Sequence, residues 1–184
     1  MIITRAQLVA ILPLAGKRAD TYLDPLNAHM AIGAIDEPIV VAAFIAQVGH
    51  ESGQFEHARE IWGPTPQQSR YEGRVDLGNI KKGDGRKFAG RGLIQLTGRD
   101  NYAAYSIFRY GDLRLLDTPE LVEQPDDAVG AAVWFWNSRE LTPVARAGNF
   151  RRITKRINGG TNGQAEREEF YRRALGVLGV NDEA

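Results

Sequence analysis

The sequence contains no cysteine, and this absence excludes several classes of fold and site. Disulfide-stapled folds, thiolate zinc sites and thiol nucleophiles all need cysteine side chains. A net charge is also lacking, because 23 basic residues balance 23 acidic ones. An overall electrostatic attraction to nucleic acid is therefore absent, and we expect no nucleic-acid partner.

Long hydrophobic runs are missing as well. The longest apolar stretch, residues 38–48, is interrupted by Gln47 and is too short to span a bilayer, so we expect no stable membrane insertion. The first residues lack an apolar core followed by a small-residue cleavage site, so they do not predict a signal peptide. We therefore expect synthesis in the cytoplasm, with any target beyond it reached through another protein.

The composition is that of one globular domain. Of the 184 residues, 43% are hydrophobic and 25% are charged, which is enough to bury a core. A monomer is the default expectation. The balanced charge hides a polarity along the chain, because residues 61–115 hold ten basic and five acidic residues. Acidic residues outnumber basic ones by three in residues 1–60 and by two in residues 116–184.

Apolar residues recur at helical spacing along most of the chain, which predicts a mainly α fold. The first helix has Thr4 as its N-cap and is ended early by Pro13. The second covers residues 22–34 and places Leu26, Met30 and Ile32 inward. Further helices are expected over residues 36–49, 99–110, 125–137, 150–157 and 164–178.

Residues 61–91 differ from the rest, with six glycines, two prolines and little helical periodicity. They predict a long loop region, which could include a short β-hairpin. A loop of this length in a compact domain is often functional. We therefore expect a single domain over residues 1–184, with a cleft and a small lobe within about residues 61–110.

Two glutamates lie at the border of this loop region. Glu51 follows an apolar helix and precedes a Ser-Gly break, and Glu60 comes nine residues later, just before the loop begins. A carboxyl group at the end of a packed helix is partly desolvated, which suits a general acid. Two carboxylates on either side of a turn can face each other across a cleft, as glycoside hydrolysis requires. Taken singly, each glutamate would more commonly be a solvated surface residue.

The pair His50-Glu51 also matches the start of the zinc motif His-Glu-x-x-His. Position 54 is Gln, however, and neither His29 nor His57 completes this spacing. We therefore expect no metal and no other cofactor. The preferred interpretation of His50 is a hydrogen-bonded residue beside the acid.

A polar cluster follows the loop region. Apolar and polar residues alternate over residues 93–97, so Gln95 and Thr97 are expected on one face of an extended piece. Together with Asn101 they offer neutral donors and acceptors, which suit sugar hydroxyls and N-acetyl groups. No Gly-Lys-Ser/Thr follows the nearby glycines, which excludes a phosphate loop. The turn over residues 157–163 comes at the end of a later helix, and its glycines alone would make it a helix cap.

These pieces together carry a family resemblance. They are residues 46–53, Glu60, residues 71–74, 90–99, 101–102 and 157–160, and Arg167. In this order, and over nearly the whole chain, they resemble glycoside hydrolase family 19, which has a chitinase-like, lysozyme-like fold. Within that family the chain resembles the bacteriophage endolysin branch, and residues 90–102 are the most specific part of the match.

The resemblance implies roles for individual residues. It places the general acid on Glu51 and the general base on Glu60. Thr97, where the chitinases typically carry Ser, would help to hold the attacking water. The residues that the resemblance assigns to substrate binding or to orientation of the acid are His50, Gln95, Asn101, Tyr102, Asn158 and Arg167. The implied reaction is single-displacement hydrolysis with inversion.

The leading hypothesis is a lysozyme that cuts peptidoglycan between N-acetylmuramic acid and N-acetylglucosamine and so lyses bacteria. The basic middle segment favours this anionic glycan over neutral chitin, the substrate of a chitinase with the same chemistry. A lytic transglycosylase would need neither Glu60 nor Thr97, and a non-catalytic wall-binding module would need neither glutamate. We expect accumulation in the host cytoplasm and release to the periplasm and cell wall through a holin-type pore protein.

Overall fold

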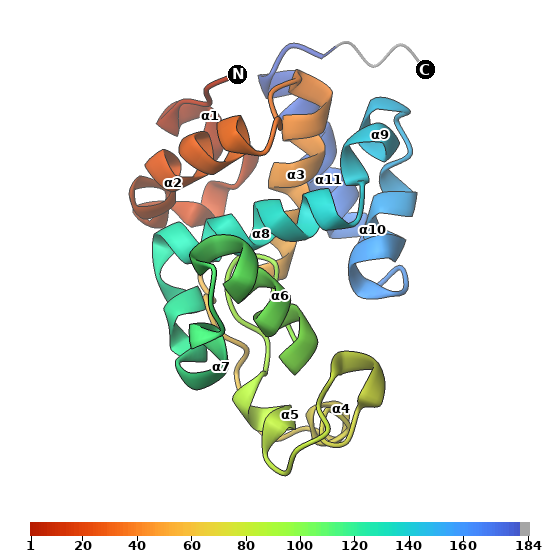
Figure 1. The fold of residues 1–184 in the computed structure, drawn as a ribbon. Helices are drawn as coiled ribbons and strands as arrows, with labels where there is room; N and C mark the ends of the chain where they lie inside the picture. The colour runs from red at the N-terminus through yellow and green to blue at the C-terminus, as the bar shows by residue number, and fades with distance from the viewer. Residues whose placement is uncertain (181–184) are drawn as a thin grey trace.

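The computed structural model describes residues 1–180, which form helices joined by turns and loops (Figure 1). The longer helices are α1 (Arg5–Ile11), α2 (Arg18–Ile32), α3 (Pro38–Glu51), α6 (Arg99–Tyr110), α8 (Pro125–Ser138), α9 (Leu141–Arg146), α10 (Phe150–Asn158) and α11 (Gln164–Val177). The short ones are α4 (Pro66–Ser69), α5 (Asp84–Lys87), α7 (Arg114–Asp117) and the 3₁₀ helices η1 (Pro13–Ala15), η2 (Val75–Leu77) and η3 (Pro119–Glu123). The expected mainly α fold is confirmed.

Helix α3 is the centre of the molecule. Every residue from Val40 to Gly49 is buried. A helix that is apolar on all sides must be surrounded by other elements. Helices α11 and α9 pack against it, and α2 and α8 pack on each other beside it (Figure 1). At its C-terminal end, His50 and Glu51 are the residues that leave the core.

The start of the chain follows the sequence pattern closely. Thr4 caps α1: its hydroxyl accepts from the Gln7 N–H at 3.2 Å, and the Gln7 amide accepts from the Thr4 N–H at 2.9 Å. The prediction that Ile32 points inward is wrong, because this side chain is 79% exposed. Ile32 lies two residues after the buried Met30, about 200° around the helix, and therefore on the opposite face.

Residues 61–89, here called the central loop, hold α4, η2 and α5 and lie at the end of the molecule away from α1 (Figure 1). The loop is closed at its neck by two hydrogen bonds. Glu60 N–H donates to the Gly90 carbonyl at 2.8 Å, and Gly92 N–H donates to the Ala58 carbonyl at 2.9 Å. Strand-type pairing within residues 1–180 is limited to isolated bridges at Arg91, so the short hairpin considered for residues 61–91 is not formed.

The extended piece expected over residues 93–97 is a tight turn instead. Arg91 and Leu96 pair through both backbone groups, with N–H···O distances of 3.2 and 2.8 Å. Because the two ends of the segment bond to each other, the chain must reverse between them. Gln95 accommodates the reversal with φ of 54°, a value that side-chain-bearing residues rarely adopt.

Within residues 1–180, no helix is long and apolar enough to cross a membrane.

Candidate active site

Glu51 ends α3, and its carboxylate is held from one side. The Oε1 atom accepts a hydrogen bond from Arg167 of α11 at 2.5 Å, and the two residues are 116 positions apart. The Glu51 side chain is 16% exposed, whereas the Arg167 side chain is only 2% exposed. Within residues 1–180, Glu51 Oε2 has no hydrogen-bond partner. One carboxylate oxygen is therefore fixed and the other is open to a ligand.

Arg167 is fixed in turn by a chain of buried polar groups. Its Nη1 atom donates to Gln47 Oε1 at 2.5 Å, and Gln47 Nε2 donates to Thr154 Oγ1 at 2.9 Å. Its Nε atom donates to the Asn162 carbonyl at 3.2 Å. These bonds join α3, α10 and α11 around the guanidinium. Of its two predicted roles, the burial of Arg167 therefore favours orienting the acid over contacting the substrate.

His50 lies beside the acid and links the same helices. Its Nδ1 atom shares a hydrogen bond of 2.5 Å with Glu166 at the start of α11. Its ring also lies against Gly163, where a β-carbon would come within 2.1 Å of His50 Cε1. The structure thus agrees with the interpretation of His50 as a hydrogen-bonded neighbour of Glu51. Among residues 1–180, no group of three or more His, Asp or Glu side chains could hold a metal ion.

Glu60 receives hydrogen bonds from three donors. Gly90 N–H donates to Oε2 at 3.0 Å, while Gln68 Nε2 and the Tyr71 hydroxyl donate to Oε1 at 2.9 and 3.5 Å. Burial, with the charge of Glu60 beside it, raises the pKa of Tyr71, so its hydroxyl remains a donor. A β-carbon at Gly90 would lie 3.3 Å from Glu60 Oε2 and 2.8 Å from Gln95 Oε1. Surroundings made of donors suit an acceptor-only, ionised carboxylate.

Gln68 is a site residue that the sequence analysis missed. Its Oε1 atom accepts from the N–H groups of Gly63 and Thr65 at 3.1 and 2.8 Å, and its Nε2 atom donates to Glu60 and to the Ile61 carbonyl. The bonds to the backbone of residues 61–65 hold the Gln68 amide in place, and its remaining N–H bond holds the Glu60 carboxylate. The available signal was the pattern Thr-x-x-Gln from Thr65 to Gln68, a capping box that predicts where a helix begins.

The predicted polar cluster lies next to Glu60. Gln95 Nε2 donates to the carbonyls of His57 and Gly92 at 3.2 and 3.1 Å, which anchors Gln95 to the neck of the central loop. Thr97 Oγ1 donates to the Gln95 carbonyl at 2.8 Å, and Asn101 Nδ2 donates to the Thr97 carbonyl at 2.7 Å. All three side chains are half-buried, so each keeps surface that a ligand can reach.

Two other predicted residues serve the protein's own structure. Tyr102 is completely buried, and its hydroxyl donates to the Ala89 carbonyl at 2.8 Å and accepts from Arg91 at 3.0 Å. A direct contact of Tyr102 with substrate is therefore wrong for this structure, and the residue supports the turn beneath the site. The Asn158 amide donates to the Asn162 carbonyl at 3.1 Å, the same carbonyl that receives Arg167.

Asp84 fastens the central loop to α6, and its removal should weaken the fold. Arg99 donates to Asp84 at 2.8 and 2.5 Å and holds the pKa of this buried carboxyl below its usual range. The pair therefore stabilises the folded state above about pH 4 and loses this contribution as the pH falls through the lower folded-state pKa. We expect Asp84→Asn to lower the free energy of unfolding by roughly 2–4 kcal/mol at pH 7.

Denaturant unfolding of the Asp84→Asn variant at neutral and acidic pH checks this expectation. The matched control is Asp76→Asn, because Asp76 pairs with Arg74 at the surface and exposed pairs contribute little. The difference between Asp84→Asn and the unsubstituted chain should shrink in acid. An equal effect of both substitutions, or a loss that does not depend on pH, would contradict the assignment.

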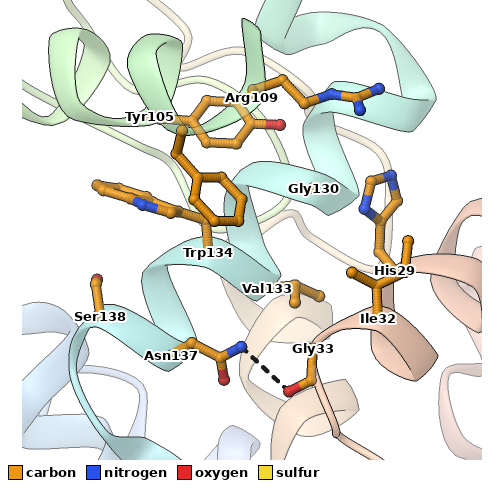
Figure 2. Close-up of a pocket in the computed structure, with 11 residues that line it drawn as sticks. His29, Ile32, Gly33, Tyr105, Arg109, Gly130, Val133, Trp134, Asn137 and Ser138 are labelled. Carbon is orange, nitrogen blue, oxygen red and sulfur yellow. Dashed lines mark hydrogen bonds between the residues drawn. The ribbon is translucent and has the colours of Figure 1, made fainter. Parts of the chain in front are cut away.

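A cavity of about 370 Å³ lies between α2, α6 and α8. Figure 2 shows Tyr105 and Trp134 on one side of it and His29, Ile32 and Val133 on the other. None of the residues predicted for the site lines this cavity. The candidate active site consists instead of two hydrogen-bonded networks, one around Glu51 and one around Glu60.

Comparison with known proteins indicates the family of the chain. No family model matches the sequence. A Haemophilus influenzae protein described as a glycosyl hydrolase family 19 domain-containing protein is 37% identical over an alignment of 161 positions, which covers 73% of this chain and 78% of that protein. The chain belongs to glycoside hydrolase family 19. It is a glycoside hydrolase with a chitinase-like fold.

Plant relatives and solved structures extend the comparison. An endochitinase of Arabidopsis thaliana is 38% identical over 121 residues, and the match covers 65% of this family 19 chain but only 39% of the plant protein. A bacterial family 19 chitinase superimposes with a TM-score of 0.76 at 24% identity, covering 100% of this chain and 98% of that one. Chitinase C of Streptomyces griseus gives a TM-score of 0.73 at 23% identity, with 97% and 77% covered. These structures share the fold.

Proposed function

We propose that this chain hydrolyses the glycan strand of peptidoglycan between N-acetylmuramic acid and N-acetylglucosamine, as an endolysin of the lysozyme type. The observation that carries the proposal is the different setting of the two glutamates. Glu51 has one oxygen fixed by Arg167 and the other open, while Glu60 is surrounded by donors at the neck of the central loop. Two carboxylates with different surroundings are what an acid and a base require.

The proposed reaction is a single displacement with inversion. Glu51 donates a proton to the glycosidic oxygen as the bond to the anomeric carbon breaks. Glu60 takes a proton from a water molecule that attacks the opposite face of the same carbon, and Thr97 helps to hold that water. Inverting enzymes need room for the water, so their two carboxyl groups stand roughly 6.5–9.5 Å apart. Gln95 and Asn101 bind the sugar through hydroxyl or N-acetyl groups.

The preference for peptidoglycan is supported by charge. Residues 61–115 hold ten basic and five acidic residues, and Glu60 lies directly before this segment. Peptidoglycan carries carboxylates on its lactyl-linked peptides, whereas chitin is neutral. Chitin is the second candidate substrate, because relatives and structural neighbours of this chain are named chitinases and endochitinases.

Product analysis separates the two substrates and tests the reaction. Purified peptidoglycan and chitin oligomers are digested side by side, and the fragments are identified by mass spectrometry. We expect reducing N-acetylmuramic acid ends from peptidoglycan, formed faster than any chitin product. Faster cleavage of chitin would overturn the substrate assignment. Anhydro-sugar ends would overturn hydrolysis in favour of transglycosylation, which needs no positioned water.

We further propose, as an extension of the lytic role, that the protein accumulates in the cytoplasm of a bacterial host infected by a phage. A separate holin-type pore protein would then release it to the periplasm and cell wall. Fractionation of cells that express this chain with and without such a pore protein tests the idea. We expect the chain in the periplasmic fraction only when the pore protein is present. Periplasmic export without it would contradict the proposal.

A further inference from the structure

The acidic residues of the central loop all have hydrogen-bond or ion-pair partners within the fold. Glu72 accepts two backbone N–H groups at 2.6 and 2.9 Å. Asp76 pairs with Arg74, and Asp84 pairs with Arg99. All three carboxylates of residues 61–89 therefore have partners, and only Glu72 keeps a negative charge that is not paired with a cation.

Most of the basic residues of the same loop have no ion-pair partner. Of its six cations, only Arg74 takes part in an ion pair within residues 1–180. The remaining five are all exposed, and they are Arg70, Lys81, Lys82, Arg86 and Lys87. Set against the single carboxylate without an ion pair, Glu72, these five cations leave the central loop with an excess of positive charge that faces solvent.

This charge is attached to the part of the chain that holds Glu60. Arg70 comes two residues after Gln68, which donates to the Glu60 carboxylate at 2.9 Å. Lys87 precedes Gly90 by three residues, and Gly90 donates to the other carboxylate oxygen at 3.0 Å. Both arms of the loop thus converge on the proposed base. A glycan bound at Glu60 therefore lies at the base of the charged loop.

We propose that these five cations form a binding site for the carboxylates of the stem peptides on peptidoglycan. The proposal rests on the proposed function and deepens it, because it names the part of the substrate that the loop recognises. Exposed lysines and arginines act as point charges that attract anionic groups over about a Debye length. A surface field of one sign can raise association rates by 10–10³-fold, and added salt lowers this gain.

The chain offers a matched control away from the central loop. Four other cations are also exposed and form no ion pair within residues 1–180. They are Arg151, Arg152 and Lys155 on α10 and Arg172 on α11. Changing these four residues to Gln removes as much charge as changing Arg70, Lys81, Lys82 and Arg86. The two quadruple variants therefore have equal net charge and differ only in where the charge is lost.

Binding is measured in a Glu51→Gln background by sedimentation with intact peptidoglycan sacculi at low salt. We expect the central-loop variant to bind roughly tenfold more weakly than its parent, and the α10/α11 variant to stay within about twofold. An amidase removes the stem peptides and leaves one lactyl carboxylate on each muramic acid of the released glycan, and on this stripped glycan the difference between the two variants should be much smaller. Circular dichroism and thermal unfolding confirm that both variants fold.

Two results would overturn the inference. Equal weakening by both variants would show that net charge matters and the loop does not. An undiminished defect of the central-loop variant on the stripped glycan would assign the cations to the glycan strand and its lactyl carboxylates instead. The proposed function is tested by a different measurement, namely cleavage of intact peptidoglycan by the unsubstituted chain. It fails if that cleavage is absent, whatever the two variants bind.

Discussion

Glu51→Gln is expected to lower hydrolysis of peptidoglycan by at least about 10²–10⁴-fold, the contribution typical of a positioned general acid. The amide has nearly the shape of the carboxyl group and can still accept the hydrogen bond from Arg167. It has no acidic proton to give to the glycosidic oxygen, however. The fold should therefore survive while the reaction is lost. Turbidity loss of chloroform-permeabilised Gram-negative cells and release of reducing sugar measure the effect.

The matched control for Glu51→Gln is Glu56→Gln. Glu56 is exposed, lies five residues further along and makes only a long ion pair of 4.0 Å with Arg18, so its substitution should leave activity unchanged. Activity of Glu51→Gln within about threefold of the parent would refute its role as the acid, since an acid contributes at least about 10²-fold. A non-catalytic wall-binding module would instead show no hydrolysis by the unsubstituted chain.

The acid and the base can be told apart by the leaving group. Glu60→Gln should cause a loss similar to that of Glu51→Gln on the natural glycan. An aryl glycoside with an acidic phenol needs no proton to depart, so Glu51→Gln should regain much of the parent's activity on it. Glu60→Gln should not, because the attacking water still lacks a base. The reverse pattern would exchange the two roles.

Local patterns in the sequence predicted much of the helical framework. Helix α6 has the expected bounds, and α8, α10 and α11 begin at the expected residues. These helices combine apolar periodicity with caps, prolines or glycines at their ends, so neighbouring residues suffice to define them. The alternation over residues 93–97 was too short to predict an extended segment reliably. Pairing of Arg91 with Leu96 reverses the chain there instead.

Local sequence patterns could not predict contacts between residues that are distant in the sequence. Nothing near Glu51 in the sequence indicates that Arg167 lies beside it, and that residue was found only through the family resemblance. Tyr102 shows the limit of resemblance, because a motif position does not tell whether a side chain faces the ligand or the core. Gln68 was missed because its pattern describes helix capping, while its amide also holds Glu60.

Arg167→Met is expected to cause the second large effect, on stability and activity together. The substitution leaves the half-buried Glu51 carboxylate and the buried Gln47 amide without their shared donor. Removing one partner of a buried ion pair costs about 3–5 kcal/mol, because the remaining charge stays uncompensated. Turnover should fall as well, since the orientation of the acid is lost.

Arg173→Met on the same helix is the matched control. Arg173 pairs with Glu169 at the surface, so its loss should lower the free energy of unfolding by less than about 1 kcal/mol. Denaturant unfolding of both variants measures stability, and kcat and KM are compared at a temperature where both are folded. If Arg167 has a merely structural role, the folded Arg167→Met variant should have the same kcat as the parent at that temperature. If Arg167 positions the acid, Arg167→Met should lower kcat with little change in KM. Arg167→Lys should then recover only part of the lost kcat, because one ammonium lacks the planar fork that reaches both Gln47 and Glu51.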